Sequence, residues 1–180
     1  IDHAVTWWMK VASKSISCHS DILMNLCRRI LALETGSGSN VIETDNSVTS
    51  AINHPIGHVT QALITLWFKQ NPNDNDLLPA ELKPIFTTLC DAQIDRFRHG
   101  RVLLGSRLIT FFRVDPPWTE QHLLPLFSWN NPVEAKAVWE GFLWSPRLYQ
   151  PLLTAFKSQF LESANHYADL NEHRPQSATF

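Results

Sequence analysis

The stretch LITLWF at residues 63–68 recurs as LITFFR at residues 108–113, an offset of 45 residues. Each copy is followed by a polar, proline-containing gap and then by a second matching piece. The second pieces are LKPIFT at residues 82–87 and LLPLFS at residues 123–128, an offset of 41. A fainter third copy runs through residues 139–144 and 150–154. Because the two pieces repeat as a pair and in the same order, the sequence indicates an internal repeat.

The repeated pieces lie in segments whose apolar residues recur at steps of three and four, the period of an amphipathic helix. Asn131 before Pro132 predicts a capped helix start, and Ser145 before Pro146 repeats the device. Pro84, Pro125 and Pro151 are predicted to lie about one turn into their helices and to bend or tighten them. The pattern predicts helices at residues 3–14, 20–34, 55–70, 79–90, 92–113 with a break near Gly100, 119–128, 132–144 and 146–168.

Helix pairs at a period of about 40 to 47 residues are typical of HEAT and armadillo arrays. The sequence therefore predicts an all-α, HEAT-like α-solenoid of about eight helices, with a compact irregular bundle as the alternative. We expect an N-terminal helical hairpin at 1–34, a flexible loop at 35–48, a helical-repeat domain at 49–170 and a polar tail at 171–180. An apolar helical pattern that begins almost at once after Ile1 suggests a piece of a longer protein.

Composition excludes several classes of protein. The 180 residues are 44% apolar and 18% charged, too apolar and too weakly charged for intrinsic disorder. A net charge of −2 lacks the basic excess expected of a nucleic-acid or membrane-surface binder. No apolar run reaches the ~18 residues that span a bilayer. The odd number of cysteines, Cys18, Cys27 and Cys90, favours buried thiols in a reducing compartment, so we expect a cytoplasmic protein.

The candidate catalytic and metal-binding patterns are weak. His54 and His58 are four residues apart and share a helix face, but no third ligand follows, which favours surface or capping histidines over a metal site. Glu81 with Lys83, and Glu134 with Lys136, each match half of a nuclease metal site but fall in first turns of predicted helices. Phosphate-loop, nucleophile-elbow and Cys-His patterns do not occur. The sequence therefore predicts no enzyme activity, cofactor or metal, with a metal-dependent hydrolase as a rival.

The densest charged feature is a basic ridge on one predicted helix, formed by Arg96, Arg98, Arg101 and Arg107 together with His99 and Arg113. Either it is a solvated face balanced by Asp91, Asp95 and Asp115, or it binds an anionic partner such as an acidic protein surface or a nucleic acid.

Among the seven Trp residues, Trp7, Trp67 and Trp139 fall on apolar stripes and are predicted to lie in the core. Trp118 and Trp129 stand at helix entries, where they either staple the chain against the following helix or protrude as anchors for a partner.

One pattern extends over most of residues 50–165 and consists of Asn53–Gly57, Ala62, Leu63, Asn131, Pro132, Glu134, Ala135, Trp139, Gly141–Arg147, Leu152, Leu153, Phe156 and Lys157. This pattern resembles the C-terminal domain of unknown function that follows sirtuin-like domains in bacterial anti-phage defence proteins. The resemblance implies that NAD cleavage belongs to a different domain and that this segment is a helical sensor, scaffold or oligomerisation surface. No catalytic residue of that family can be assigned to this chain. We expect a non-catalytic interaction segment that binds its own N-terminal domain, another protomer or a phage protein, with a nucleic-acid-binding helical module as the alternative.

Overall fold

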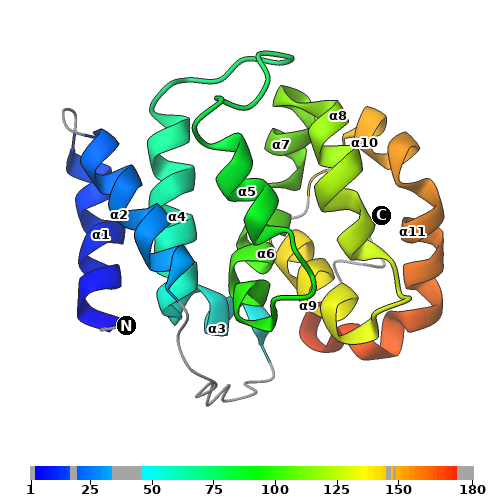
Figure 1. The fold of residues 1–180 in the computed structure, drawn as a ribbon. Coiled ribbons are helices and arrows are strands. Elements are labelled where there is room, and N and C mark those ends of the chain that lie inside the picture. Colours follow the sequence, from blue (N-terminus) through cyan, green and yellow to red (C-terminus); the bar gives the residue numbers. More distant parts are fainter. Residues whose placement is uncertain (1–2, 17–19, 34–45, 145–146, 148, 174–180) are drawn as a thin grey trace.

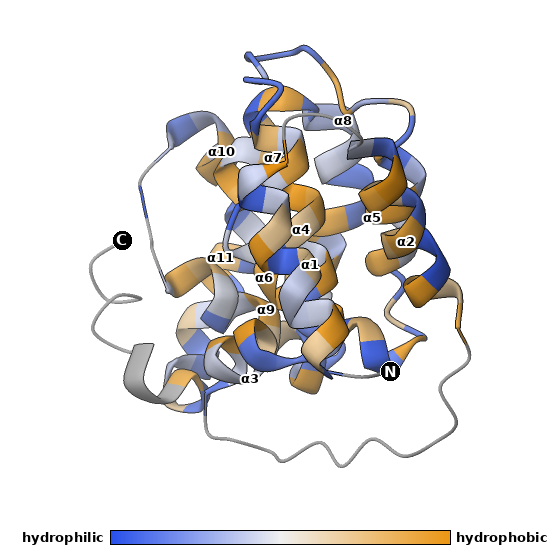
Figure 2. Ribbon diagram, turned by 90° about the vertical axis from the view of Figure 1, so that its left-hand side faces the viewer, coloured by the Kyte–Doolittle hydropathy of each residue, from blue (hydrophilic) through white to orange (hydrophobic). Residues whose placement is uncertain are grey.

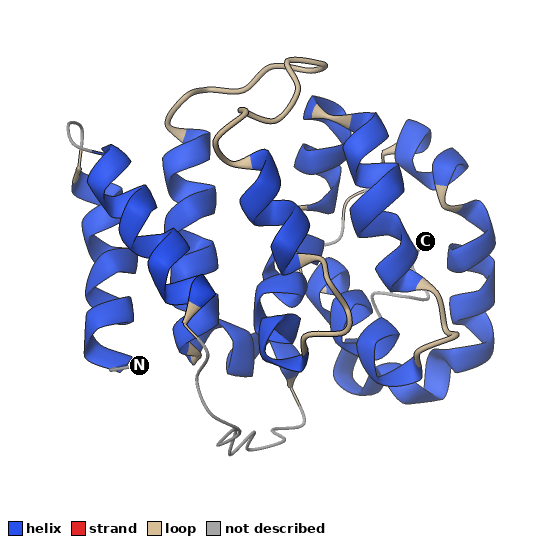
Figure 3. Ribbon diagram, viewed as in Figure 1, coloured by secondary structure: helices blue, strands red, loops and turns tan. Residues whose placement is uncertain are grey.

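The computed structural model describes residues 3–16, 20–33, 46–144, 147 and 149–173. Every regular element in these ranges is a helix, and none of the described residues forms a strand (Figure 3). The α-helices are α1 His3–Ser15, α2 Ser20–Ala32, α3 Ser47–Asn53, α4 Pro55–Phe68, α5 Lys83–Leu89, α6 Arg98–Gly105, α7 Leu108–Val114, α8 Pro116–Trp118, α9 Pro132–Leu143, α10 Gln150–Ala155 and α11 Lys157–Ser163. Four further short helices of 3₁₀ or π type are η1 Asp95–Phe97, η2 Thr119–Leu123, η3 Leu124–Phe127 and η4 Ala164–His173.

The predicted all-α class is confirmed, and the helices follow one another across the molecule from α1 and α2 at one side to α10 and α11 at the other (Figure 1). α1 packs along α4 through the buried side chains of Thr6, Met9 and Ser13. In the parts of the chain that are described, no helix is long and apolar enough to cross a membrane.

Local sequence explains where several helices begin. His54 precedes α4, and its Nδ1 accepts a hydrogen bond from the backbone N–H of Ile56 over 3.1 Å. Asn131 precedes α9 and accepts from the N–H of Glu134 over 3.3 Å, as its position before Pro132 predicts. These side chains satisfy N–H groups that have no partner within the helix. The predicted cap at residues 145 and 146 lies outside the described residues.

The prediction that three prolines lie about one turn into their helices, and bend or tighten them, is wrong for Pro84 and Pro151. These two lie at the first or second position of α5 and α10. Pro125 does lie within a continuous helical run, Pro116–Phe127, which changes from π to 3₁₀ type at Leu124, as the tightening alternative predicts. A proline nitrogen has no hydrogen to donate. In the first turn this removes no hydrogen bond, because the N–H groups there have no partner within the helix. The helices are therefore shorter than the apolar pattern suggests.

Several boundaries differ from the predicted ones. The segment 92–113 is divided into η1, α6 and α7, with the break at Ser106 and Arg107 rather than near Gly100, which lies within α6. α3 begins at Ser47, inside the segment 35–48 that we expected to be a loop, and residues 35–45 of that segment lie outside the described residues. η4 continues to His173, beyond the expected start of the polar tail.

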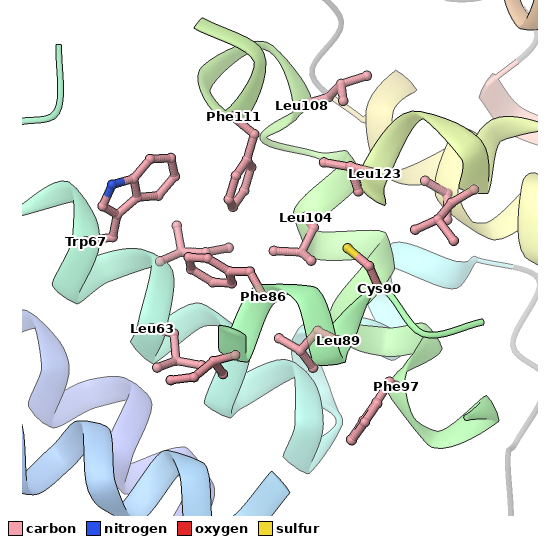
Figure 4. Close-up of a cluster of buried hydrophobic side chains, with 14 of the residues drawn as sticks. Leu63, Trp67, Phe86, Leu89, Cys90, Phe97, Leu104, Leu108, Phe111 and Leu123 are labelled. Atoms are coloured by element: carbon pink, nitrogen blue, oxygen red, sulfur yellow. The ribbon is translucent and has the colours of Figure 1, made fainter. Parts of the chain in front are cut away.

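Most of the buried apolar side chains form one cluster that runs from Met9 in α1 to Leu170 in η4. Its centre is aromatic, as Figure 4 shows for Trp67, Phe86 and Phe111, which point toward one another from α4, α5 and α7. The ring centroid of Phe111 lies 4.7 Å from that of Trp67 and 5.2 Å from that of Phe86. Packed aromatic rings at such distances bury a large area, so this centre fixes how the three helices sit together.

α6 and α9 cross with their backbones nearly in contact. A Cβ atom added at Gly141 of α9 would lie 2.2 Å from the carbonyl oxygen of Val102 in α6. Only glycine permits this approach, because any side chain would clash with the backbone of α6. Near the starts of the same two helices, Arg101 of α6 contacts Glu134 of α9.

Candidate interaction surfaces

Arg101, which the sequence places on a surface ridge, is fully buried with 0% of its surface exposed. Its Nε and Nη2 donate to the carboxylate of Glu134 over 2.5 and 2.9 Å. Its Nη1 donates to the backbone carbonyls of Leu89, Asp91 and Ile94. The prediction that Arg101 contacts a partner is wrong, because its guanidinium group links the end of α5 to the start of α9 inside the protein.

The remaining arginines of the ridge do not form one continuous surface. Arg98 donates to Glu134 over 3.2 Å and to Asp95 over 2.8 Å. Arg96 donates to backbone carbonyls at the end of α2. Arg107 is exposed and precedes α7. A nucleic-acid interface along Arg96–Arg107 is therefore interrupted at the buried Arg101, and three of its four arginines, Arg96, Arg98 and Arg101, are engaged by the chain itself.

Trp118 and Trp129 are buried, with 2% and 5% of their surface exposed. Trp118 donates from Nε1 to the hydroxyl of Thr87 in α5 over 2.8 Å. The ring of Trp129 stacks on that of His166, with centroids 3.9 Å apart. The prediction that these two side chains anchor a partner is wrong, since both pack against the chain itself, including helices remote from the one that follows.

Four histidines gather where α1, α4 and α6 meet. The rings of His54 and His99 stack with centroids 3.9 Å apart, and those of His3 and His58 meet edge to face at 4.7 Å. His54 caps α4, which confirms the capping alternative, whereas His58 is buried and bonds the hydroxyl of Thr6 over 3.1 Å. Within the described ranges, no three His, Cys, Asp or Glu side chains are placed to hold one metal ion.

The environment of these histidines disfavours their charged form. Burial, and then the charges of His99 and His3, lower the pKa of His54 to about 4. Burial lowers the pKa of His58 to about 4 as well, with Lys10 as the next contribution. The pKa of His99 is also about 4, because of burial and the nearby arginines of α6. At neutral pH the rings of His54, His58 and His99 are therefore uncharged, which leaves Nδ1 of His54 free to accept its capping hydrogen bond.

Members of the two nuclease-like pairs are engaged in ion pairs within the protein, and two of the cysteines are buried. Glu134 is bound by Arg98 and Arg101, and Lys83 pairs with Asp115 over 2.9 Å, so neither pair presents a free lysine and carboxylate to a substrate. Cys27 and Cys90 are buried as predicted for Cys27, and burial raises the pKa of each thiol to about 12. Cys18 lies outside the described residues.

Two buried carboxylates were not singled out from the sequence as functional or structural sites. Asp115 caps α8 and accepts from the N–H of Leu78 and from Lys83. Burial alone would raise the pKa of Asp115, but these hydrogen bonds outweigh it and lower the pKa. Glu140 is buried in α9 and accepts from the N–H of Ser47 over 3.1 Å, which ties α3 to α9. Apart from the N–H of Trp118, which Asp115 caps, their partners lie 32 to 93 residues away along the chain, so no local pattern reveals these contacts.

The outer side of α1 is an exposed apolar surface, which we call the α1 face and define by Ala4, Trp7, Trp8 and Val11. At about 100° per residue these four positions lie on one side of the helix. Trp7 is 52% exposed and Trp8 57% exposed, and Val11 is also exposed. Figure 2 views the molecule from the side on which α1 lies. The prediction that Trp7 lies in the core is wrong, because α1 turns its other side toward α4.

One edge of the α1 face is basic. His3, Lys10 and Lys14 lie along the same side of the helix, next to Trp7. Burial and then the charge of Lys14 lower the pKa of Lys10. Between His3 and Ser15 the sequence contains no Asp or Glu. The α1 face therefore combines exposed aromatic surface with a border of positive charge that no acidic residue of the helix balances.

Compared with protein-family models, with curated proteins and with solved structures, the chain matches none of them. The resemblance to the domain behind sirtuin-like proteins therefore stays an expectation from the sequence.

Proposed function

We propose that this chain is a non-catalytic helical interaction segment, and that it docks through the α1 face onto another protein. The observation that carries the proposal is the pair of adjacent tryptophans, Trp7 and Trp8, each more than half exposed on one helix face. Tryptophan is the residue most enriched among the side chains that dominate binding energy at protein interfaces. Contiguous exposed apolar surface of this kind marks an interaction site more often than isolated exposed residues do.

The two rings would supply a large part, but not all, of the free energy that specific binding requires. A Trp side chain buries about 150–250 Å² in a core or an interface, so covering the exposed half contributes roughly 2–3 kcal/mol per ring. Two such rings supply about half of the free energy that a micromolar complex requires, before the cost of association is subtracted. Exposed Val11 adds apolar area beside them.

The charge border favours one kind of partner. Lys10 and Lys14 would meet like charges in a second α1 packed antiparallel, because each positive helix start would face the other chain's Lys14. An apolar helical surface flanked by Asp or Glu would instead meet complementary charge. We therefore favour an acidic, apolar helix of another polypeptide as the occupant over a second copy of this chain.

For the finer fold, we infer a HEAT-like arrangement. Residues 63–68 and 108–113, the first repeated pieces, lie in α4 and α7, and the second pieces lie in α5 and in η2 and η3. The third copy falls in α9 and α10. Each copy thus contributes two successive helices, as a helical repeat requires.

We place this segment in a larger cytoplasmic protein, and the family resemblance suggests anti-phage defence as its setting. The segment would then sense a trigger or hold another domain. Deleting residues 1–180 from the full-length protein should abolish its triggered response, and a deletion that leaves the response intact refutes the sensor role.

Site-specific photo-crosslinking tests the docking surface. A benzophenone amino acid replaces Trp7 in one sample and Leu161, an exposed apolar residue of α11, in the control. We expect position 7, and not position 161, to crosslink to one protein at a segment with apolar residues flanked by Asp or Glu. Equal products from both positions, or crosslinks from position 7 to lipid only, contradict the proposal.

A further inference from the structure

A polar pocket lies where α6 ends and α7 begins, beside the chain that leaves α9. Its volume is about 160 Å³. Three arginines line it, Arg107, Arg113 and Arg147, together with the hydroxyl-bearing Thr110 and the ring of Phe142. The contact between the rings of Phe112 in α7 and Tyr149, at 6.3 Å, places Tyr149 beside α7. The pocket is therefore built from three separate parts of the chain.

The pocket has an excess of positive charge. Arg113 forms one ion pair, with Asp74 over 2.7 Å, and both of these side chains are about half exposed. Within the described residues, neither Arg107 nor Arg147 forms an ion pair. The three guanidinium groups of the pocket thus have a single ion-paired carboxylate between them, that of Asp74 on Arg113. Two positive charges are therefore left without a negative counterpart among the described residues.

We propose that this pocket binds a phosphate group. The planar guanidinium group of arginine presents two parallel N–H donors that match the oxygens of a phosphate, and three arginines around one pocket can surround a dianion. Phe142 and Leu108 also line the pocket beside the arginines. Drug-sized ligands require about 300–1,000 Å³, so a pocket of about 160 Å³ suits one tetrahedral anion rather than a whole nucleotide.

The phosphate site stands independently of the α1 face. Its arginines come from residues 107–147, and none of its lining residues belongs to α1. It differs from the ridge predicted from sequence, because Arg147 replaces the buried Arg101 and the paired Arg98. Inorganic phosphate and the phosphate group of a small ester present the same oxygens and negative charge to the pocket.

Isothermal titration with sodium phosphate, at constant ionic strength set by chloride, measures the site directly on the full chain. We expect one phosphate per chain. Arg107→Gln and Arg147→Gln should each weaken binding by about tenfold or more, because each removes a charge-assisted hydrogen-bond donor. Arg29→Gln, which changes an exposed arginine of α2, is the matched control and should leave the affinity unchanged.

Asp74→Asn should change the affinity for phosphate in the opposite direction. It frees Arg113 from its ion pair and removes the only acidic group paired with the pocket's arginines in the described structure. Phosphate should therefore bind more tightly, by up to about fivefold, the size expected from releasing an exposed ion pair.

The outcomes separate the sources of the phosphate. Tighter binding of inorganic phosphate than of glycerol 3-phosphate supports the free ion, and the reverse order supports a small phosphate ester. No saturable binding at millimolar phosphate, or equal loss in Arg29→Gln and Arg107→Gln, overturns the proposal. Binding of an oligonucleotide without terminal phosphates that inorganic phosphate does not displace also overturns it, because it indicates contact with a nucleic-acid backbone.

Discussion

Removing the carboxylate of Glu134 should strongly destabilise the protein. In the Glu134→Ala variant, the buried guanidinium group of Arg101 loses both oxygens that it contacts at 2.5 and 2.9 Å, and Arg98 loses a third contact at 3.2 Å. Breaking a buried ion pair by removing one partner costs about 3–5 kcal/mol, because the remaining charge is buried without compensation. The folding free energy of a domain is only about 5–15 kcal/mol, so this variant approaches the limit of stability.

Urea unfolding followed by circular dichroism measures the effect, with Glu120→Ala as the control. Glu120 is an exposed glutamate of η2, and its loss should change the free energy of unfolding by no more than about 0.5 kcal/mol. If Glu134→Ala does not fold, Glu134→Gln keeps one oxygen acceptor and should show an intermediate loss. A loss below about 1 kcal/mol in Glu134→Ala would refute the role given to this ion pair.

The double variant Arg101→Met, Glu134→Leu sharpens the test. Replacing a buried ion pair with apolar residues is often neutral or stabilising. Here it should remain destabilising, because the carbonyls of Leu89, Asp91 and Ile94 also lose the donor that Arg101 supplies. A double variant as stable as the wild type would show that these carbonyls do not depend on Arg101.

Three further predictions concern stability, each measured by urea unfolding. The pKa of His54 is about 4 in the folded protein and about 6.5 when unfolded, so the unfolded chain binds protons more readily and stability falls as pH decreases from about 6.5 to about 4. His54→Asn, which keeps a capping side chain, should reduce this slope by up to about 1.4 kcal/mol per pH unit, and an unchanged slope would contradict the assignment. Gly141→Ala should lower the free energy of unfolding by about 3 kcal/mol, because its Cβ would lie 2.2 Å from a backbone oxygen. Gly100→Ala should lower it less, because the atoms 3.0 Å from its Cβ belong to side chains. Equal losses in the two variants would count against the close helix crossing. Trp139→Phe should cost about 1 kcal/mol more than Trp67→Phe, because it breaks a 3.1 Å hydrogen bond whereas Nε1 of Trp67 has no partner among the described residues, and the reverse order would be inconsistent with this difference.

The helices with strong local signals could be predicted from the sequence. His54 before Pro55, and Asn131 before Pro132, combine a capping side chain with a proline that suits only the first turn. These signals act over three or four residues, so they need no knowledge of the fold. α3 was missed because its 7 residues are too few for a periodic pattern.

The candidate site was less predictable, because contacts between remote segments decide burial. Arg101 stands among other charged residues in the sequence, and its partner Glu134 lies 33 residues away. α1 carries apolar residues on several sides, so periodicity alone does not say which side faces the core. In the structure the buried side includes Thr6 and Ser13, whose hydroxyls donate to carbonyls of their own helix. Because this side of α1 faces the core, Trp7 and Trp8 lie at the surface.

The central claim is that the α1 face binds an apolar, acid-flanked helix of another protein. The most direct measurement is the dissociation constant of the segment crosslinked from position 7, prepared as a peptide and titrated into the wild type, Trp7→Ser/Trp8→Ser and the control Leu161→Ser. Because both tryptophans are more than half exposed, the double variant should fold as well as the wild type. We expect the double variant to bind the peptide at least about thirtyfold more weakly, which corresponds to about 2 kcal/mol, while Leu161→Ser binds normally. Equal affinity of all three proteins for the peptide would contradict the claim.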